Sequence, residues 1–265
     1  MTASGCHEST VRPVGITQLL VLLLCLASPA RAFERVVSLN LCTDQLLVLL
    51  APEKIAALSF LARDPALSFV AAPAASFPLV RASAEAVLAL RPDLVLAARY
   101  GAQATLAVLE QDGLHVVRLD LPQSFDAIRM QTRSLAALLG VPARAESLIA
   151  AMDATLAAAP HRPHPITALA WEPRGYTAEP GSLMDAVLHH AGLVNAGDGR
   201  RMGIEALLRH PPGLLVVPDT PNFPSLATAM LDHPALLGIP HRAVPPALTL
   251  CAGPFSARAV ELLAR

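Results

Sequence analysis

Apolar residues along the chain occur in short runs that alternate with amphipathic stretches. Short apolar runs between turn residues are typical of buried strands, and apolar residues three or four positions apart are typical of helices. The runs predict strands at 35–39, 55–59, 94–97, 115–119, 166–171 and 242–244. The stretches predict helices near 43–50, 102–112, 124–139, 142–159, 182–191, 225–232 and 254–265, with Thr43 or Asp44 capping the first. Strands that alternate with helices predict an α/β fold with parallel, covered sheets.

Two stretches of the chain are nearly the same. Residues 83–97 read SAEAVLALRPDLVLA, and residues 203–217 read GIEALLRHPPGLLVV. Each predicts a short helix with an acid in its first turn, a proline stop and an apolar strand. Glu85 and Glu205 fall in register, as do Pro92 and Pro212. The repeat predicts two similar lobes, each with a surface carboxylate at an equivalent place. Two lobes imply a cleft, and two matched surface acids imply a partner.

A longer helix is expected between the two halves, in the stretch VPARAESLIAAMDATLAAA. Gly140 ends the preceding helix, and Pro142 suits the first turn of the next one. A helix from Pro142 to about Ala159 would be about 27 Å long. It is either a rigid rod between two lobes or an ordinary surface helix.

Composition limits the class of protein. The 265 residues, 54% of them hydrophobic, suffice for one large domain or for two lobes of about 100 residues. The net charge of −1 does not indicate a nucleic-acid-binding protein, since such proteins carry an excess of basic residues. The apolar segment ITQLLVLLLCLA is too short to span about 30 Å of hydrocarbon. Arg12 precedes it and Ala30-Arg31-Ala32 follows, which predicts a secretory signal peptide at residues 1–32 and a soluble exported protein that starts near Phe33.

Export would place the cysteines of the mature chain where disulfides can form. Cys6 and Cys25 leave with the signal peptide, and Cys42 and Cys251 remain as an even pair in an oxidising compartment. They form either a disulfide or two separate buried thiols.

Motifs for catalysis or metal binding do not stand out. The chain has no glycine-rich phosphate loop after a strand, no GxSxG and no HExxH. His189 and His190 are adjacent, so on a helix they point about 100° apart and share a metal poorly. We therefore expect no catalytic residues, no metal ligands and no resident cofactor.

Aromatic and basic residues gather in the loops that follow the predicted strands. In parallel α/β lobes, ligands contact the loops at the carboxyl ends of strands. The only Trp and both Tyr lie in such loops, with several arginines, which suits a large, partly apolar ligand that can be anionic. For Trp171 the alternative is a core position at the end of a strand. The candidate ligand-binding residues are Leu41, Cys42, Arg63, Arg99, Tyr100, Trp171, Tyr176 and Phe255.

Five motifs in order resemble one family. RVVSLNLCTDQLL, the two repeat units, GYTAEPGSLMDAVLHHAGLVNAG and CAGPFSARAVELL are similar to motifs of the periplasmic substrate-binding proteins of ABC importers for iron-siderophores, cobalamin and haem. The resemblance covers essentially all of residues 33–265. It implies two α/β lobes with central parallel sheets, joined by a single long rigid helix, with the ligand cleft between them. The implied parts are a lobe at 33–140, the connecting helix at 141–163 and a lobe at 164–265.

The resemblance also implies roles for residues. Glu85 and Glu205 match the acids, one per lobe, that dock onto the permease dimer of the importer. Cys42 lies in the first cleft loop and Cys251 in the last, so both line the lobe junction and we hypothesise that they form a disulfide. The implied protein is a periplasmic monomer and not an enzyme.

The ligand implied by the resemblance is a metal chelate, either a ferric siderophore or a cobalamin-like molecule. The tryptophan-rich cleft of cobalamin binders is not reproduced, because the chain has one Trp. Ferric siderophores and haem stay open, and in a haem binder Tyr100 or Tyr176 would ligate the iron. Two further alternatives are an exported chelate-processing enzyme and a sensory protein with the same fold.

Overall fold

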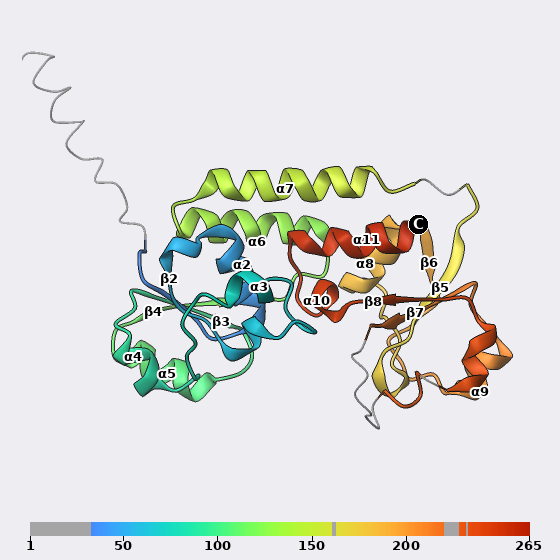
Figure 1. Cartoon of the computed structure of the whole chain (residues 1–265), viewed down its shortest axis with the longest axis horizontal. Coiled ribbons are helices and arrows are strands. Elements are labelled where there is room, and N and C mark those ends of the chain that lie inside the picture. Colours follow the sequence, from blue (N-terminus) through green and yellow to red (C-terminus); the bar gives the residue numbers. More distant parts are fainter. Residues whose placement is uncertain (1–32, 161–162, 220–227, 232) are drawn as a thin grey trace, which may run out of the picture. The chain divides into compact units, whose positions relative to one another are not determined.

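A computed structural model describes residues 33–160, 163–219, 228–231 and 233–265 (Figure 1). The expected signal peptide, residues 1–32, lies outside the described residues. Of the helix expected near 225–232, only residues 228–231 are described, and they form a turn. Within the described ranges, no helix has both the length and the apolar character needed to cross a membrane.

The first half of the chain forms the N-terminal lobe around a parallel sheet. Its strands are β1 (Val36–Ser38), β2 (Ile55–Ala57), β3 (Leu94–Ala98) and β4 (His115–Leu119), in the order β2-β1-β3-β4. The accompanying helices are α2 (Leu41–Leu50), α3 (Ala71–Ala74), α4 (Ala84–Ala89), α5 (Gln103–Gln111) and α6 (Phe125–Leu138), with 3-10 turns η1 (Pro52–Lys54) and η2 (Phe60–Arg63).

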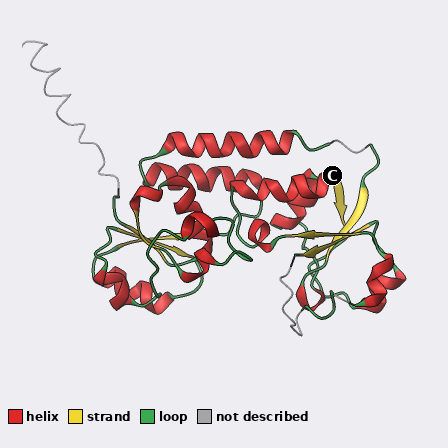
Figure 2. Cartoon of the chain, in the orientation of Figure 1, coloured by secondary structure: helices red, strands yellow, loops and turns green. Residues whose placement is uncertain are grey.

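The second half forms the C-terminal lobe around a sheet of the same design. Its strands are β5 (Ile166–Ala170), β6 (Leu193–Asn195), β7 (Leu214–Pro218) and β8 (His241–Val244), in the order β6-β5-β7-β8. The helices are α8 (Leu183–His190), α9 (Ile204–Arg209), α10 (Pro246–Thr249) and α11 (Ala257–Ala264), with 3-10 turns η3 (Pro173–Gly175), η4 (Pro234–Gly238) and η5 (Pro254–Ser256). The predicted α/β fold with two similar lobes is confirmed, and in Figure 2 helices flank the strands of both sheets.

The sequence repeat is a structural repeat. Helices α4 and α9 and strands β3 and β7 begin 120 residues apart, at 84 and 204 and at 94 and 214. Val87 and Leu207 hold the same place in the two helices, and both are fully buried. Glu85 and Glu205 lie in the first turns of α4 and α9 and are exposed. The repeat unit is thus a helix that turns one face to its sheet and leaves an acid outside.

Alternate residues of each strand face opposite sides of the sheet, as the pleat requires. In β3, Leu94 and Leu96 belong to one core cluster, whereas Val95 and Ala97 belong to another that α4 and α5 cover. The first of these clusters also contains buried residues of the C-terminal sheet, such as Val216. The lobes therefore share one continuous apolar core.

The expected connecting helix is α7 (Pro142–Ala157), which begins at the predicted proline. It packs against α6 and α11, and Figure 1 shows it beside both. Arg133 and Arg129 of α6 pair with Glu146 and Asp153 of α7, at 2.7 and 2.5 Å. Arg144 of α7 pairs with Glu53 at 2.7 Å and donates to the Leu50 carbonyl at the end of α2. Ion pairs thus fix α7 to the N-terminal lobe, and packing against α11 joins it to the other.

The other predicted boundaries hold to within two residues, apart from the last helix, which starts as the 3-10 turn η5. The helix predicted near 225–232 is not found in its described residues, 228–231, which form a turn. The predicted cap of the first helix is wrong. Asn40 caps α2, because its side chain accepts from the Cys42 N–H at 2.9 Å, and Thr43 and Asp44 are buried inside the first turn. Strand β6 and helices α3 and α10 were not predicted, since three or four residues carry no readable period.

Candidate functional site

Two hollows lie where the predicted ligand loops lie, at the carboxyl ends of strands. The N-lobe hollow, about 240 Å³, lies at the ends of β3 and β4. It is lined by Asn40, Cys42, Thr43, Ala98, Arg99, Tyr100, Leu119, Asp120, Leu121 and Gln131. The C-lobe hollow, also about 240 Å³, lies at the ends of β5, β7 and β8. It is lined by Glu172, Met184, Val216, Val217, Pro218, Val244, Pro246, Thr249 and Leu250.

The N-lobe hollow brings together three of the predicted residues: Cys42, Arg99 and Tyr100. Arg99 follows β3 and forms a two-point ion pair with Asp120, which follows the neighbouring strand β4. This guanidinium lowers the pKa of the Asp120 carboxyl by its hydrogen bond and its charge. The Tyr100 ring is 84% exposed at the edge of the hollow. The hollow therefore offers an internally balanced charge pair and a free phenol.

The C-lobe hollow is apolar apart from the acid Glu172 and the hydroxyl of Thr249. Burial raises the pKa of the Glu172 carboxyl. Sequence reasoning missed Glu172 and Asp120, although the rule that selected their neighbours Trp171 and Arg99 also covers the residues that follow β5 and β4.

The Cys42–Cys251 disulfide links a residue that lines the N-lobe hollow to a residue next to the C-lobe hollow. Its Cα atoms are 5.1 Å apart, within the range of ordinary disulfides. Cys42 lines the N-lobe hollow, and Cys251 directly follows Leu250, which lines the C-lobe hollow. The two hollows are thus anchored to each other by a covalent bond.

Tyr176 lies after β5, as predicted, but lines neither hollow. Its ring is about half exposed, and the Arg201 guanidinium lies 5.8 Å from the ring centre. The backbone of Tyr176 bridges to Arg201, which holds the loop against residues 200–202. Tyr176 is accordingly available at the surface of the C-terminal lobe.

The structure corrects the prediction for Leu41 and Trp171. Leu41 is 4% exposed and packs in the shared core, because it is the first residue of α2 and turns inward. Trp171 is fully buried with Leu207 and Leu215, and its indole N–H donates to the Met202 carbonyl at 3.0 Å. Neither side chain can touch a ligand in this structure.

Phe255 and Arg63 also line neither the N-lobe hollow nor the C-lobe hollow. Phe255 is buried and stacks on Phe69 with ring centres 4.8 Å apart, so it fixes the last turn to the N-terminal lobe. Arg63 donates to the carbonyls of Ala74 and Phe77 and so ties η2 to the segment around α3.

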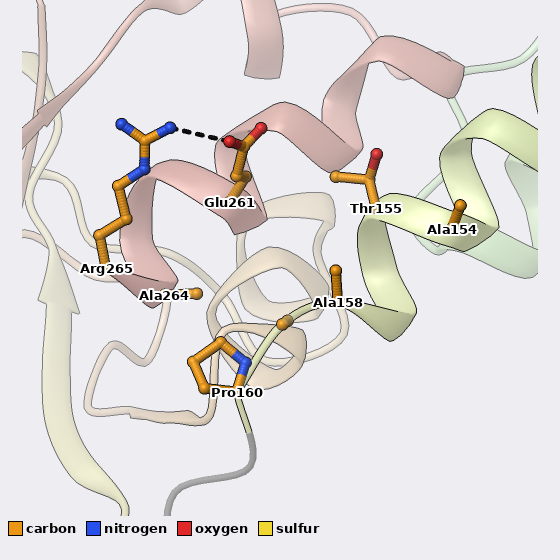
Figure 3. Close-up of a pocket in the computed structure, with 8 residues that line it drawn as sticks. Ala154, Thr155, Ala158, Pro160, Glu261, Ala264 and Arg265 are labelled. Carbon is orange, nitrogen blue, oxygen red and sulfur yellow. Dashed lines mark hydrogen bonds and ion pairs between the residues drawn. The ribbon is translucent and has the colours of Figure 1, made fainter.

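A larger hollow of about 590 Å³ lies elsewhere, where α7 and α11 end (Figure 3). Small residues such as Ala154, Ala158 and Ala264 line it, and the Glu261–Arg265 ion pair lies at its edge, at 2.8 Å. It contains none of the predicted site residues.

A buried polar cluster includes Thr43, which lines the N-lobe hollow, and the next residue, Asp44. Asp44 is fully buried, and its carboxylate accepts from the Ser59 hydroxyl at 2.5 Å and from the Ser59 N–H at 3.1 Å. Burial outweighs these hydrogen bonds and raises the pKa of Asp44 to about 6. Ser38 and Thr43 hydrogen-bond each other at 2.7 Å. In the described ranges, no three His, Cys, Asp or Glu side chains gather closely enough to hold a metal ion.

Comparison with known proteins identifies the relatives of this fold. A model of the periplasmic binding protein family matches residues 36–240. The haem-binding protein RhuT of Roseiflexus sp. RS-1, in its apo form, is 25% identical, with a TM-score of 0.67 over 87% of this chain and 96% of that one. A periplasmic haem-binding protein of Pseudomonas aeruginosa is 24% identical, with a TM-score of 0.69 over 88% and 91%.

A third structure, described as a possible iron-binding, periplasmic solute-binding protein of Staphylococcus epidermidis, is 18% identical, with a TM-score of 0.71 over 88% and 98%. At this identity the likeness shows the fold alone. No curated protein matches the chain. The family model covers more than three quarters of the chain, and the two-lobe fold agrees with it. The chain belongs to the periplasmic binding protein family.

Proposed function

We propose that this protein is a periplasmic solute-binding protein that captures a metal chelate and delivers it to the permease of an ABC importer. The observation that carries the proposal is the pair of hollows at the carboxyl ends of both sheets, held to each other by the Cys42–Cys251 bond. Family membership supports this role, and it supports a non-enzymatic one. In this proposal the two hollows together contact one ligand.

The docking role of Glu85 and Glu205 is part of the same proposal. Both carboxylates are exposed, and neither forms an ion pair within the described part of the chain. A helix dipole alone favours an acid in a first turn, by about 0.3–1 kcal/mol. It does not require the same acid at the same register in both lobes. Two unpaired acids on equivalent helices suit a permease that presents one arginine-bearing surface to each lobe.

Haem is the second candidate ligand. One observation favours it: RhuT, which is 25% identical over most of its length, is a haem-binding protein. The exposed phenol of Tyr100 at the N-lobe hollow is then the group that would ligate ferric iron. Tyr176, also exposed, is the alternative ligand.

Titration of the purified protein with four probes tests the proposal: cyanocobalamin, a ferric trihydroxamate, a ferric tris-catecholate and haem. Fluorescence of Trp171 and absorbance of the chelate report binding. The proposal predicts micromolar or tighter binding of one probe, and the absence of all binding would overturn it. A haem complex whose ferric absorbance spectrum changes in Tyr100→Phe, and not in Tyr176→Phe, would support haem as the ligand and Tyr100 as the residue that binds its iron.

A further inference from the structure

Among the described residues, Glu172 is the one ionisable side chain that lines the C-lobe hollow. Its neighbours there are the side chains of Val, Pro, Leu and Met residues and the hydroxyl of Thr249. A carboxylate among apolar walls loses hydration, and a protein tolerates this when a partner restores the lost interactions.

Glu172 has no such partner within the described residues. Its side chain makes no hydrogen bond and no ion pair there, whereas Glu53, Glu110 and Glu146 each pair with an arginine. Burial raises the pKa of the Glu172 carboxyl. The carboxyl is therefore a partly buried group that lines the hollow and has no protein partner among the described residues.

The backbone fixes Glu172 in this place. Its N–H donates to the Tyr176 carbonyl at 2.7 Å, and its own carbonyl accepts from the Gly175 N–H at 2.9 Å. The preceding Trp171 is locked in the core by its bond to Met202. A fixed backbone of this kind lowers the cost of ordering the site when a ligand binds.

We infer that the C-lobe hollow binds an alkylammonium arm of the ligand, with the ammonium on Glu172 and the methylene chain against the apolar walls. The inference rests on the proposed function and specifies its ligand class. The charge of the N-lobe hollow agrees, because Arg99 and Asp120 neutralise each other and leave the Glu172 carboxylate as the unbalanced charge. A polyanionic chelate would bring its charge against that carboxylate.

The test compares two chelates that differ in one charge. The first is a linear ferric trihydroxamate with a free terminal ammonium, and the second is the same chelate with its amine acetylated. Calorimetric titration of the full exported protein should give about tenfold tighter binding of the ammonium form, because charge-assisted hydrogen bonds are the strong ones. In Glu172→Gln the preference should disappear, while the affinity for the acetylated form stays within about twofold.

The control is Glu261→Gln, which removes an acid of the same lobe beside the separate hollow at the end of α7. It should keep the tenfold preference. Equal affinities of the wild-type protein for the two chelates, or an unchanged preference in Glu172→Gln, would overturn the inference and leave the proposed function standing. Absence of binding to both forms, with tight binding of haem or a tris-catecholate, would also overturn it. Absence of binding to every chelate would instead overturn the proposed function.

Discussion

Cys42, in the first turn of α2, is bonded to Cys251, in the turn that precedes α11, although 209 residues separate them in the chain. The Phe69–Phe255 stack also joins the first part of the chain to the last, and the Arg258 guanidinium lies 4.8 Å from the centre of the Phe69 ring. With α7 and the shared core, the lobes are therefore connected at several places. This design favours a binding protein with limited movement between its lobes.

Removal of the disulfide should lower the free energy of unfolding strongly. In the chain-entropy model, closing a loop of this length stabilises the folded state by about 5 kcal/mol. Cys42→Ser combined with Cys251→Ser should lose an amount of that order, since the serines fit the same space. Urea unfolding of both proteins, with and without reductant, measures the difference.

Reductant provides the internal control for that experiment. It should destabilise the wild-type protein and leave the double serine variant unchanged. If reductant leaves the wild-type urea midpoint where it was, the bond does not contribute to stability as argued.

The fold was largely predictable from sequence because its signals are local. The helix–proline–strand pattern recurs at a spacing of 120 residues, and both copies fold alike. Gly140 and Pro142 mark the end of α6 and the start of α7. Short elements such as β6 form because they pair with neighbouring strands. β6 pairs with β5, and its own three residues have no period that would predict a strand.

The site was less predictable because the face on which a side chain lies depends on strand alternation and on distant partners. Leu169 and Trp171 share a face of β5 and its extension, and that face packs on Leu207 of α9, so Trp171 enters the core. Its neighbour Glu172 reaches the hollow instead. The Phe255 ring stacks on the ring of Phe69, which lies far away in sequence, and no local pattern indicates that contact.

Charge reversal at Glu85 and Glu205 should separate docking from ligand binding. Glu85→Arg with Glu205→Arg places two cations where the proposed permease arginines approach, so transport should fall by at least about tenfold. Ligand affinity should stay within about twofold, because both residues lie on exposed helix turns and line neither hollow. Uptake by cells that carry the permease, together with titration of the purified protein, measures both quantities.

A matched control for docking is Glu110→Arg, on α5 of the N-terminal lobe, where the acid pairs with Arg118. Exposed ion pairs contribute little to stability, so this variant should fold and transport normally. Normal uptake by the Glu85/Glu205 double variant would contradict the docking role.

Substitution of Phe255 should lower stability and leave ligand affinity nearly unchanged, whereas substitution of Tyr100 should do the reverse. Phe255→Ala empties a buried, stacked position and should cost about 3–5 kcal/mol of stability, with ligand affinity nearly unchanged. Tyr100→Ala removes an exposed ring and should change stability by less than about 0.5 kcal/mol, with a loss of affinity. Urea unfolding and ligand titration of both variants test the pair. Reversed results would return Phe255 to the ligand site and remove Tyr100 from it.

Asp44 should make the protein less stable as the pH rises through the weakly acidic range. Its pKa is raised from 3.8 to about 6 in the folded protein, so between these values the folded state holds a proton that the unfolded chain releases. Unfolding therefore releases a proton, and the contribution of Asp44 is fully present below pH 3.8 and is lost as the pH rises through about 6. The loss between pH 4 and pH 7 is about 2–3 kcal/mol.

Comparison with Asp44→Asn isolates this contribution. Acids such as Glu53, Glu146 and Asp120 have pKa values lowered by their arginine partners, and they change stability with pH in the opposite direction. They are the same in both proteins, so they cancel in the difference. The Asn side chain is neutral at every pH and can still accept from the Ser59 N–H. Urea unfolding of both proteins at pH 4 and pH 7 gives the free energy of unfolding of the variant relative to that of the wild type. This difference should be about 2–3 kcal/mol more favourable to the variant at pH 7 than at pH 4. Parallel pH profiles of the two proteins would mean that Asp44 titrates normally despite its burial.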